Sequence, residues 1–420
     1  MPYVLHPELR DPLFEGTICM NHLFRSTLPI VLSLLFAPVL SAETIDFANL
    51  PNYATQPRPA YITRNNTPPN NQISNAGATL GRVLFYDKKL SVNNTIACAS
   101  CHQQAHGFSD LNRSSAGVNG STGRHSMRLI NARFAREARF FWDERAASLE
   151  AQTTQPIQDH AEMGWSGANG DPSLADLIDK MEAIPYYPYM FERVYGTPEI
   201  TEVRMQQALA QFVRSIQSFD SKYDVGRAQV PNDGAPFPNF TAAENAGKQL
   251  FLQPPQFNAQ GQRIGGGAGC QGCHSAPEFD IDPNSLSNGV IGSIAGAQDL
   301  TNRRSPSLRD SFKPNGTTNG AFMHDGSLAT MESVIAHYNA IPNAAAAPGV
   351  AASVDPRLRP GGNPQRLQLT TTDQANLVAF LKTLSGTNVY TDPKYASPFD
   401  AFGNLEVVGL NSGLSGWAMY

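Results

Sequence analysis

Two short motifs place cysteine and histidine side chains at a spacing that suits covalent attachment of a cofactor. They read CASCH and CQGCH, and their chemically active residues are Cys98, Cys101, His102, Cys270, Cys273 and His274. In a C-x-x-C-H motif, the two thiols form thioether bonds to a porphyrin and the histidine that follows binds its iron. A four-cysteine zinc site, a redox dithiol and structural disulfides are alternatives, but none of them needs a histidine directly after each cysteine pair. The two motifs therefore predict two covalently bound c-type haems, with His102 and His274 as iron ligands.

A third stretch, FMHDGSLATMESVIAHY, concentrates side chains that can occupy the other axial position of a haem iron. Its candidates are Met323, His324, Met331, His337 and Tyr338. In a helix, Tyr338 shares one face with Val334 and Ile335, because residues three and four positions apart are neighbours. This periodicity predicts that Tyr338 points inward, but it does not decide among the candidates.

The composition limits the class of protein. A chain of 420 residues is long enough for two or more domains with their own cores. The 34 glycines and 31 prolines indicate that loops make up much of the chain. The formal net charge of −5 gives no basic footprint, so we expect no nucleic-acid partner.

The N-terminal region has the layout of a secretory signal. Arg25 precedes an apolar run at 28–40, and small residues follow at 41 and 42. The run is too short to span a bilayer, although an uncleaved anchor is the alternative interpretation. We interpret residues 1–42 as an upstream extension and signal peptide. We therefore expect an exported, periplasmic protein with no membrane span after cleavage.

The segments around the two motifs repeat weakly. Ahead of them lie AGATLGRVLFYDKKLS and TAAENAGKQLFLQ, each with a glycine before an apolar LF pair, as in an amphipathic helix. Thr241 and Glu244 begin the latter with the spacing of a capping box. Behind the motifs, two further helices are predicted, and Gly386 is the expected C-cap of the second. Their apolar faces consist of Leu209, Phe212, Val213, Ile216, Leu377, Phe380, Leu381 and Leu384.

These patterns predict a mainly α fold made of two tandem cytochrome-c-like haem domains with long loops. The N-terminal haem domain is assigned to residues 43–228 and the C-terminal haem domain to residues 229–400, with a tail at 401–420. The proline-rich stretch RAQVPNDGAPFPNF connects the two domains.

Further motifs resemble the bacterial di-haem cytochrome c peroxidases and the related MauG proteins of methylamine utilisation. They are LGRVLFYDKKLS before the first haem motif, LINARF and FFWDERAASLEAQTTQPIQDHAEMG after it, and SPSLRD and FMHDGSLATMESV after the second. The resemblance extends over most of the chain, from about Gly77 to Gly386. It implies peroxide chemistry at the N-terminal haem and electron storage or relay at the C-terminal haem.

The resemblance also implies residues for peroxide chemistry. Glu162 matches the family's acid-base glutamate, and Gln152 and Pro156 match residues of its distal pocket. Trp142 matches the tryptophan that lies between the two haems. Without the resemblance, Glu162 would read as a surface carboxylate and Trp142 as core. We expect His160, beside Glu162, to be an ordinary loop histidine.

The distal side of the first haem departs from part of the family. Members that need reductive activation carry a distal histidine where this chain has Val118-Asn119, so the chain looks like the MauG branch, with an open distal position. His125 stands where the family usually has an asparagine that helps to bind calcium between the haems. Calcium is therefore possible but doubtful.

The resemblance selects Tyr338 among the axial candidates, because MauG places a tyrosine at this position and activated peroxidases place a methionine. A phenolate oxygen favours oxidised iron, whereas methionine raises the reduction potential. Met323, Met331 and His337 remain alternatives. His324 matches a histidine that is kept near the haems, and we expect it to be hydrogen-bonded.

Two classes of function follow. The first is a di-haem c-type peroxidase that reduces hydrogen peroxide with electrons from a small c-type cytochrome or cupredoxin, or uses peroxide to oxidise a protein substrate. The second is a di-haem electron-transfer protein without peroxide chemistry. Glu162, Gln152 and the missing distal histidine favour the enzyme.

Overall fold

The structure is a computed structural model that describes residues 42–410. Residues 1–41, which hold nearly all of the predicted signal peptide, and residues 411–420 of the predicted tail lie outside the described residues. Below, residues 43–228 are called the first half and residues 229–400 the second half.

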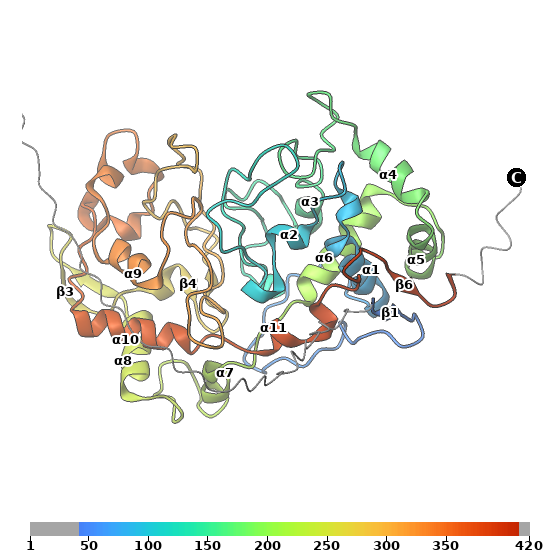
Figure 1. The fold of residues 1–420 in the computed structure, drawn as a ribbon. Helices are drawn as coiled ribbons and strands as arrows, with labels where there is room; N and C mark the ends of the chain where they lie inside the picture. Colours follow the sequence, from blue (N-terminus) through green and yellow to red (C-terminus); the bar gives the residue numbers. More distant parts are fainter. Residues whose placement is uncertain (1–41, 411–420) are drawn as a thin grey trace, which may run out of the picture. The chain divides into compact units, whose positions relative to one another are not determined.

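Helices joined by long loops dominate the described part of the chain, as the mainly α prediction requires (Figure 1). The α-helices are α1 (Asn75–Tyr86), α2 (Cys98–Cys101), α3 (Leu149–Thr153), α4 (Leu174–Glu182), α5 (Tyr186–Tyr195), α6 (Glu202–Ser215), α7 (Lys222–Arg227), α8 (Ala242–Leu252), α9 (Met331–Asn339), α10 (Thr371–Lys382) and α11 (Asn388–Thr391). The strands are β1 (Thr44–Ile45), β2 (Pro255–Phe257), β3 (Arg263–Gly266), β4 (His274–Ser275), β5 (Asp280–Ile281) and β6 (Glu406–Val407). They form two-stranded ladders: β1 with β6 in parallel, and β2 with β3 and β4 with β5 in antiparallel pairs.

The first half is built on the packing of α1 against α6. A Cβ atom at Gly81 of α1 would lie 2.0 Å from the carbonyl oxygen of Ala208 on α6, so only glycine permits this approach of the two backbones. Phe85 and Phe212 meet across the same pair with their ring centroids 5.2 Å apart. Phe108, which follows the first haem motif, packs 6.0 Å from Phe85.

The second half repeats this arrangement with α8 and α10. A Cβ atom at Gly247 of α8 would lie 1.9 Å from the carbonyl oxygen of Asn376 on α10. Phe251 and Phe380 have their ring centroids 5.3 Å apart, and Phe279, after the second haem motif, lies 5.6 Å from Phe251. The weak sequence repeat thus corresponds to two helix pairs with the same glycine contact and the same group of three phenylalanines.

The predicted helix faces are buried in the two cores, as expected from their periodicity. The capping box of α8 is also confirmed: Thr241 accepts from the Glu244 N–H at 3.2 Å, and Glu244 accepts from the Thr241 N–H at 2.6 Å.

The expected C-cap at Gly386 is wrong. Helix α10 ends at Lys382, and Thr383 is its cap residue. Gly386 instead lies against Asp220, whose Oδ1 would be 2.1 Å from a Cβ atom at this position, and its N–H donates to Asp310 Oδ1 at 3.0 Å. The glycine therefore allows a close contact between segments and does not supply a left-handed turn.

The chain returns to the first half after α10. Residues 388–410, part of the predicted second domain and tail, pack on the core of the first half (Figure 1). The Tyr53 hydroxyl donates to the Lys394 carbonyl at 2.7 Å, and the Tyr86 hydroxyl donates to the Tyr395 carbonyl at 2.6 Å. Strand β6 then pairs with β1, so the two ends of the described chain complete one core together.

Among residues 42–410, no helix is both long enough and apolar enough to cross a membrane.

Candidate haem sites

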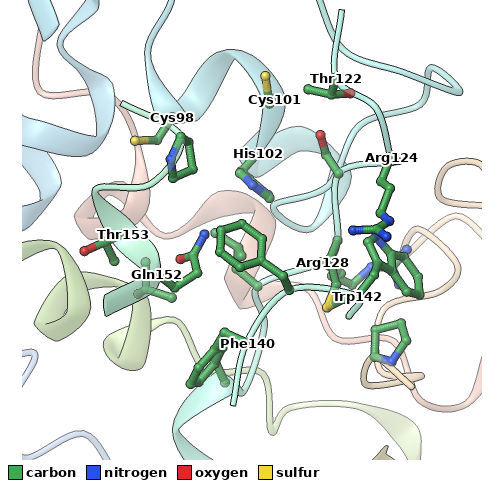
Figure 2. A pocket seen from close by; sticks show the side chains of 18 of the residues that line it. Cys98, Cys101, His102, Thr122, Arg124, Arg128, Phe140, Trp142, Gln152 and Thr153 are labelled. Carbon is green, nitrogen blue, oxygen red and sulfur yellow. The ribbon is translucent and has the colours of Figure 1, made fainter. Parts of the chain in front are cut away.

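The first haem motif lies at the edge of a cavity of about 560 Å³ (Figure 2). Cys98 and Cys101 begin and end α2, a single turn whose first residue and fourth residue face the same side. Ser100, between them, accepts the N–H of Ala97 at 3.0 Å and so closes the turn. The local fold therefore presents both thiols to one side of the cavity, with His102 directly after them.

The His102 ring is held in one orientation. Its Nδ1 lies 3.1 Å from the Phe108 carbonyl, to which an Nδ1–H donates, and this leaves Nε2 as the nitrogen that can bind a metal. Burial lowers the pKa of His102, although the Phe108 carbonyl acts in the opposite direction. A neutral imidazole is the form that an iron ligand requires.

The residues that we predict to act on peroxide line this same cavity. Gln152 lies on α3, whose N-cap Ser148 accepts the N–H of Ala151 at 3.1 Å, and Pro156 and Glu162 follow in the next loop. Burial raises the pKa of Glu162 to about 7; the charge of Asp159 adds to this rise. A carboxyl group with such a pKa can both give and take a proton near neutral pH.

The loop that carries Val118-Asn119 supports the Glu162 loop from behind. The N–H groups of Val118 and Asn119 donate to the carbonyls of Glu162 and Ala161 at 3.0 and 3.2 Å. Neither Val118 nor Asn119 lines the cavity. Through these two hydrogen bonds the loop fixes the backbone at Glu162.

The other histidines near this site are engaged within the protein. The His125 ring contacts the Asn112 carbonyl through Nδ1 at 2.9 Å and Ser109 Oγ through Nε2 at 3.4 Å. Burial lowers the pKa of His125 to about 4, against the effect of the Asn112 carbonyl. His160 is exposed and pairs with Asp171 at 2.7 Å, as expected for a loop histidine.

Trp142 lies where the two halves meet. Its indole Nε1–H donates to the His125 carbonyl at 2.8 Å, and its own carbonyl accepts the N–H groups of Arg303 and Arg304 at 2.8 and 3.0 Å. Its ring centroid is 6.3 Å from that of His324 in the second half. Trp142 also lines the first cavity, so it connects this cavity to the second half.

The second haem motif borders another cavity, of about 600 Å³. Cys270 begins a short 3-10 turn, Cys273 follows it, and His274 is the first residue of β4. Burial lowers the pKa of His274 to about 4, while the backbone of Phe279 acts in the opposite direction. The ring is thus neutral, as at the first motif.

Tyr338 faces this second cavity from α9, together with Val334 and Ile335, as its helical position predicted. Burial raises the pKa of its hydroxyl well above the usual value. Two of its rivals, His337 and Met323, do not line the cavity and instead contact Asn288 in its wall. His337 Nε2 contacts the Asn288 carbonyl at 2.9 Å, and Met323 Sδ accepts from the Asn288 amide at 3.1 Å.

The remaining candidates for the axial ligand, Met331 and His324, differ in whether they line the second cavity. Met331 lines the second cavity but is buried in the core at 2% exposure. His324 contacts the Gly292 carbonyl through Nε2 at 2.8 Å, as expected for a hydrogen-bonded histidine. The assignment of Tyr338 as the iron ligand stays a prediction, with Met331 as the alternative that shares its cavity.

The residues of both cavities fit a c-type haem. Each cavity joins two thiols to one neutral imidazole and has a volume in the range of cofactor sites. In the first, the half-buried Arg128 guanidinium donates to the Asn319 carbonyl at 2.7 Å and makes no ion pair with a carboxylate among the described residues. Figure 2 shows Arg128 and Arg124 on the side of the cavity away from Cys98. Haem carries two propionates opposite its thioether edge, so an unpaired cation there suits it.

The calcium site that the resemblance suggests stays a prediction. Over residues 42–410, no group of three or more His, Cys, Asp or Glu side chains could hold a metal ion. Where the two halves meet, the Arg124 guanidinium forms ion pairs with Asp143 and Asp299.

Patterns along the sequence did not point to several residues that the structure adds to these sites. Arg124, Arg128 and Asn288 belong to no recognisable motif. The wall of the first cavity also includes second-half residues, namely Asp280, Asp299, Arg304, Pro306 and Ser307. Only tertiary packing brings them there.

Each cavity contains one C-x-x-C-H motif, and the two cavities lie beside equivalent helix pairs. This arrangement is typical of proteins that bind two c-type haems. A family described as di-haem cytochrome c peroxidase matches residues 75–229. The methylamine utilization protein MauG of Methylophilus methylotrophus is 28% identical over 369 residues, which cover 84% of this chain and 95% of that protein. The cytochrome c551 peroxidase of Nitrosomonas europaea is 28% identical over 273 residues, 61% of this chain and 71% of that protein.

A solved structure agrees with these relatives. The crystal structure of a MauG-like protein associated with microbial copper homeostasis has a TM-score of 0.62 and 27% identity, and it covers 81% of this chain and 98% of its own. The chain is thus similar to di-haem cytochrome c peroxidases and MauG proteins in part of its sequence and in its fold.

Proposed function

We propose that the protein is a di-haem c-type peroxidase that reduces hydrogen peroxide at the first cavity and receives electrons through the second. The observation that carries this proposal is the convergence of Glu162, Gln152 and Pro156 on the cavity of the first haem motif. When bound, the haem supplies the iron at which peroxide is reduced. The reaction takes up two electrons and two protons, breaks the O–O bond and yields two water molecules.

In this proposal, Glu162 moves the proton. Its carboxylate accepts a proton from one peroxide oxygen and gives it to the other, which leaves as water. The pKa of about 7 that burial produces suits both steps. Gln152, on the neighbouring turn, offers an amide that can orient peroxide by hydrogen bonding.

Tyr338 and Trp142 would take part in electron transfer between the two haem sites. Tyr338 would bind the second iron through its phenolic oxygen, which favours the oxidised state of that iron. Trp142 lies in the wall of the first cavity and contacts the second half, where an indole can shorten the electron path. The two equivalent helix pairs support an interpretation as tandem cytochrome-c-like domains.

The partners and location are part of the same proposal. A small c-type cytochrome or cupredoxin would deliver the electrons, or a protein substrate would lose them in a MauG-like reaction. Attachment of c-type haem takes place outside the cytoplasm, so we propose a periplasmic location.

Electron paramagnetic resonance of the oxidised protein tests the open first site. We expect one high-spin and one low-spin ferric haem, because Val118-Asn119 replaces a distal histidine and Tyr338 completes the second site. Two low-spin signals would contradict an open peroxide site and would favour a plain electron carrier.

A further inference from the structure

A three-way ion pair joins the two halves at the wall of the first cavity. The Arg124 guanidinium donates to Asp143 Oδ2 at 2.7 Å within the first half. It also donates to Asp299 Oδ2 of the second half at 2.9 and 3.1 Å, and to Thr301 Oγ1 at 2.9 Å. All three charged residues line the cavity and are shielded in part from water.

The residues adjacent to this ion pair hold Trp142. Asp143 directly follows Trp142, and Arg124 directly precedes His125, whose carbonyl accepts the indole N–H. The His125 N–H donates to the His324 carbonyl of the second half at 2.7 Å. The guanidinium thus ties together the two backbone segments that orient the indole.

We infer that Arg124 is a positioning residue that holds Trp142 at the contact between the two halves and so sets the rate of electron passage between the two haem sites. This inference rests on the proposed function. Peroxide would take two electrons as its O–O bond breaks: one would come from the first haem and one would pass from the second haem, so that each haem would be oxidised by one electron.

The electrostatics explain why Arg124 is needed. Burial acts to raise the pKa of Asp143, but the hydrogen bond from Arg124 and the charges of Arg145 and Arg124 outweigh it and lower the pKa. For Asp299, hydrogen bonds from its neighbours and from Arg124 likewise hold the pKa below the usual range despite burial. Both carboxylates are therefore charged, and without the guanidinium they would repel each other across the contact between the halves.

The test compares Arg124→Gln with Arg64→Gln. Arg64 also pairs across the halves, with Glu278 at 3.5 Å, but it touches neither Trp142 nor the first cavity. One equivalent of peroxide is mixed with each fully loaded protein in a stopped-flow spectrometer. The spectra separate the reaction at the first haem from the later oxidation of the second.

We expect Arg124→Gln to slow oxidation of the second haem by about tenfold to a hundredfold, the size of effect that a small misplacement can cause. Arg64→Gln should match wild type. Arg124→Lys should restore part of the rate, because a lysine keeps the charge but cannot bind two carboxylates as a planar fork does. Asp299→Asn provides a second variant should Arg124→Gln not fold, and it should slow the same step.

Equal rates in wild type and Arg124→Gln would overturn the inference, as would equal slowing in Arg64→Gln. A different result marks failure of the proposed function itself: in that case wild type would show no spectral change at either haem after peroxide.

Discussion

Both halves of the chain form the wall of the first cavity, whereas every residue that lines the second comes from the second half. The helix pairs beneath them are alike, with Gly81 and Gly247 at the same kind of contact. The first cavity adds acid-base and charged side chains, among them Glu162 and Arg124. The second adds Tyr338 within a largely apolar wall.

This difference suits the two roles that we propose, in which the same kind of helix pair supports proton transfer at one cavity and electron storage at the other. Proton transfer needs groups that titrate near the working pH, and the first cavity provides one in Glu162. Storage of an electron needs an iron with a fixed axial ligand, and in the second cavity Tyr338 is the ligand that we propose. Residues of the second half complete the wall of the first cavity, which also contains Trp142. The proposed electron path therefore ends at the cavity in which peroxide would react.

The largest expected effect tests the acid-base role that we assign to the first cavity alone. Glu162→Gln should slow the reaction with peroxide by roughly 10²–10⁴-fold, since the amide cannot move a proton. Stopped-flow mixing with peroxide measures the rate, and absorption spectra check that both haems remain attached. His160→Gln, at an exposed position in the same loop, is the control and should react as wild type does. An unchanged rate in Glu162→Gln would make Glu162 a structural carboxylate.

The next effect tests the axial ligand of the second cavity. Tyr338→Met should raise the reduction potential of the second haem by part of the roughly 0.8 V that axial ligands span, because a thioether favours reduced iron. The fold should persist, since methionine adapts to apolar surroundings. Spectroelectrochemical titration measures the potential. Met331→Leu is the matched control, and a shift in that variant instead would identify Met331 as the ligand.

A smaller effect concerns pH. The pKa of Glu162 is raised to about 7, so its carboxylate form grows as pH increases through that value. If the carboxylate takes the proton from peroxide, the rate should rise about tenfold per pH unit below the pKa and level off above it. A profile of the peroxide rate from about pH 5 to 9 measures this. Glu162→Gln should flatten the rise; a wild-type profile without an inflection would argue against the assigned role.

The smallest effect is expected from removal of calcium. The Arg124 guanidinium already pairs with Asp143 and Asp299 where the halves meet, and Arg145 adds a second positive charge beside Asp143. A calcium chelator should therefore leave the haem spectra and the peroxide rate unchanged. Loss of activity that added calcium restores would show that a bound cation supports this contact as well.

The sequence predicted those parts of the molecule that depend on local patterns. Helix periodicity placed Leu209 and Leu377 in the cores, and the C-x-x-C-H spacing located both haem motifs. The convergence of Gln152 and Glu162 on the first cavity was expected only through the family resemblance, because neither lies in a local motif of its own. Arg124 and Asp299 are 175 positions apart, and no pattern along the chain links them.

Close contacts were equally hard to foresee. Gly386 looked like a helix cap because glycine usually ends helices, but the structure uses it for contact with Asp220. The return of residues 388–410 to the first core likewise left no sign in the hydrophobic pattern.

That return has a consequence for the order of biogenesis. A chain that is made and exported from its N-terminus presents the first half long before residues 388–410 appear. Tyr395 and strand β6, which complete the first core, arrive among the last described residues. The half that carries CASCH is thus the last to close. If the protein is exported as we propose, CASCH would stay accessible to enzymes that attach haem while the rest of the chain is still emerging.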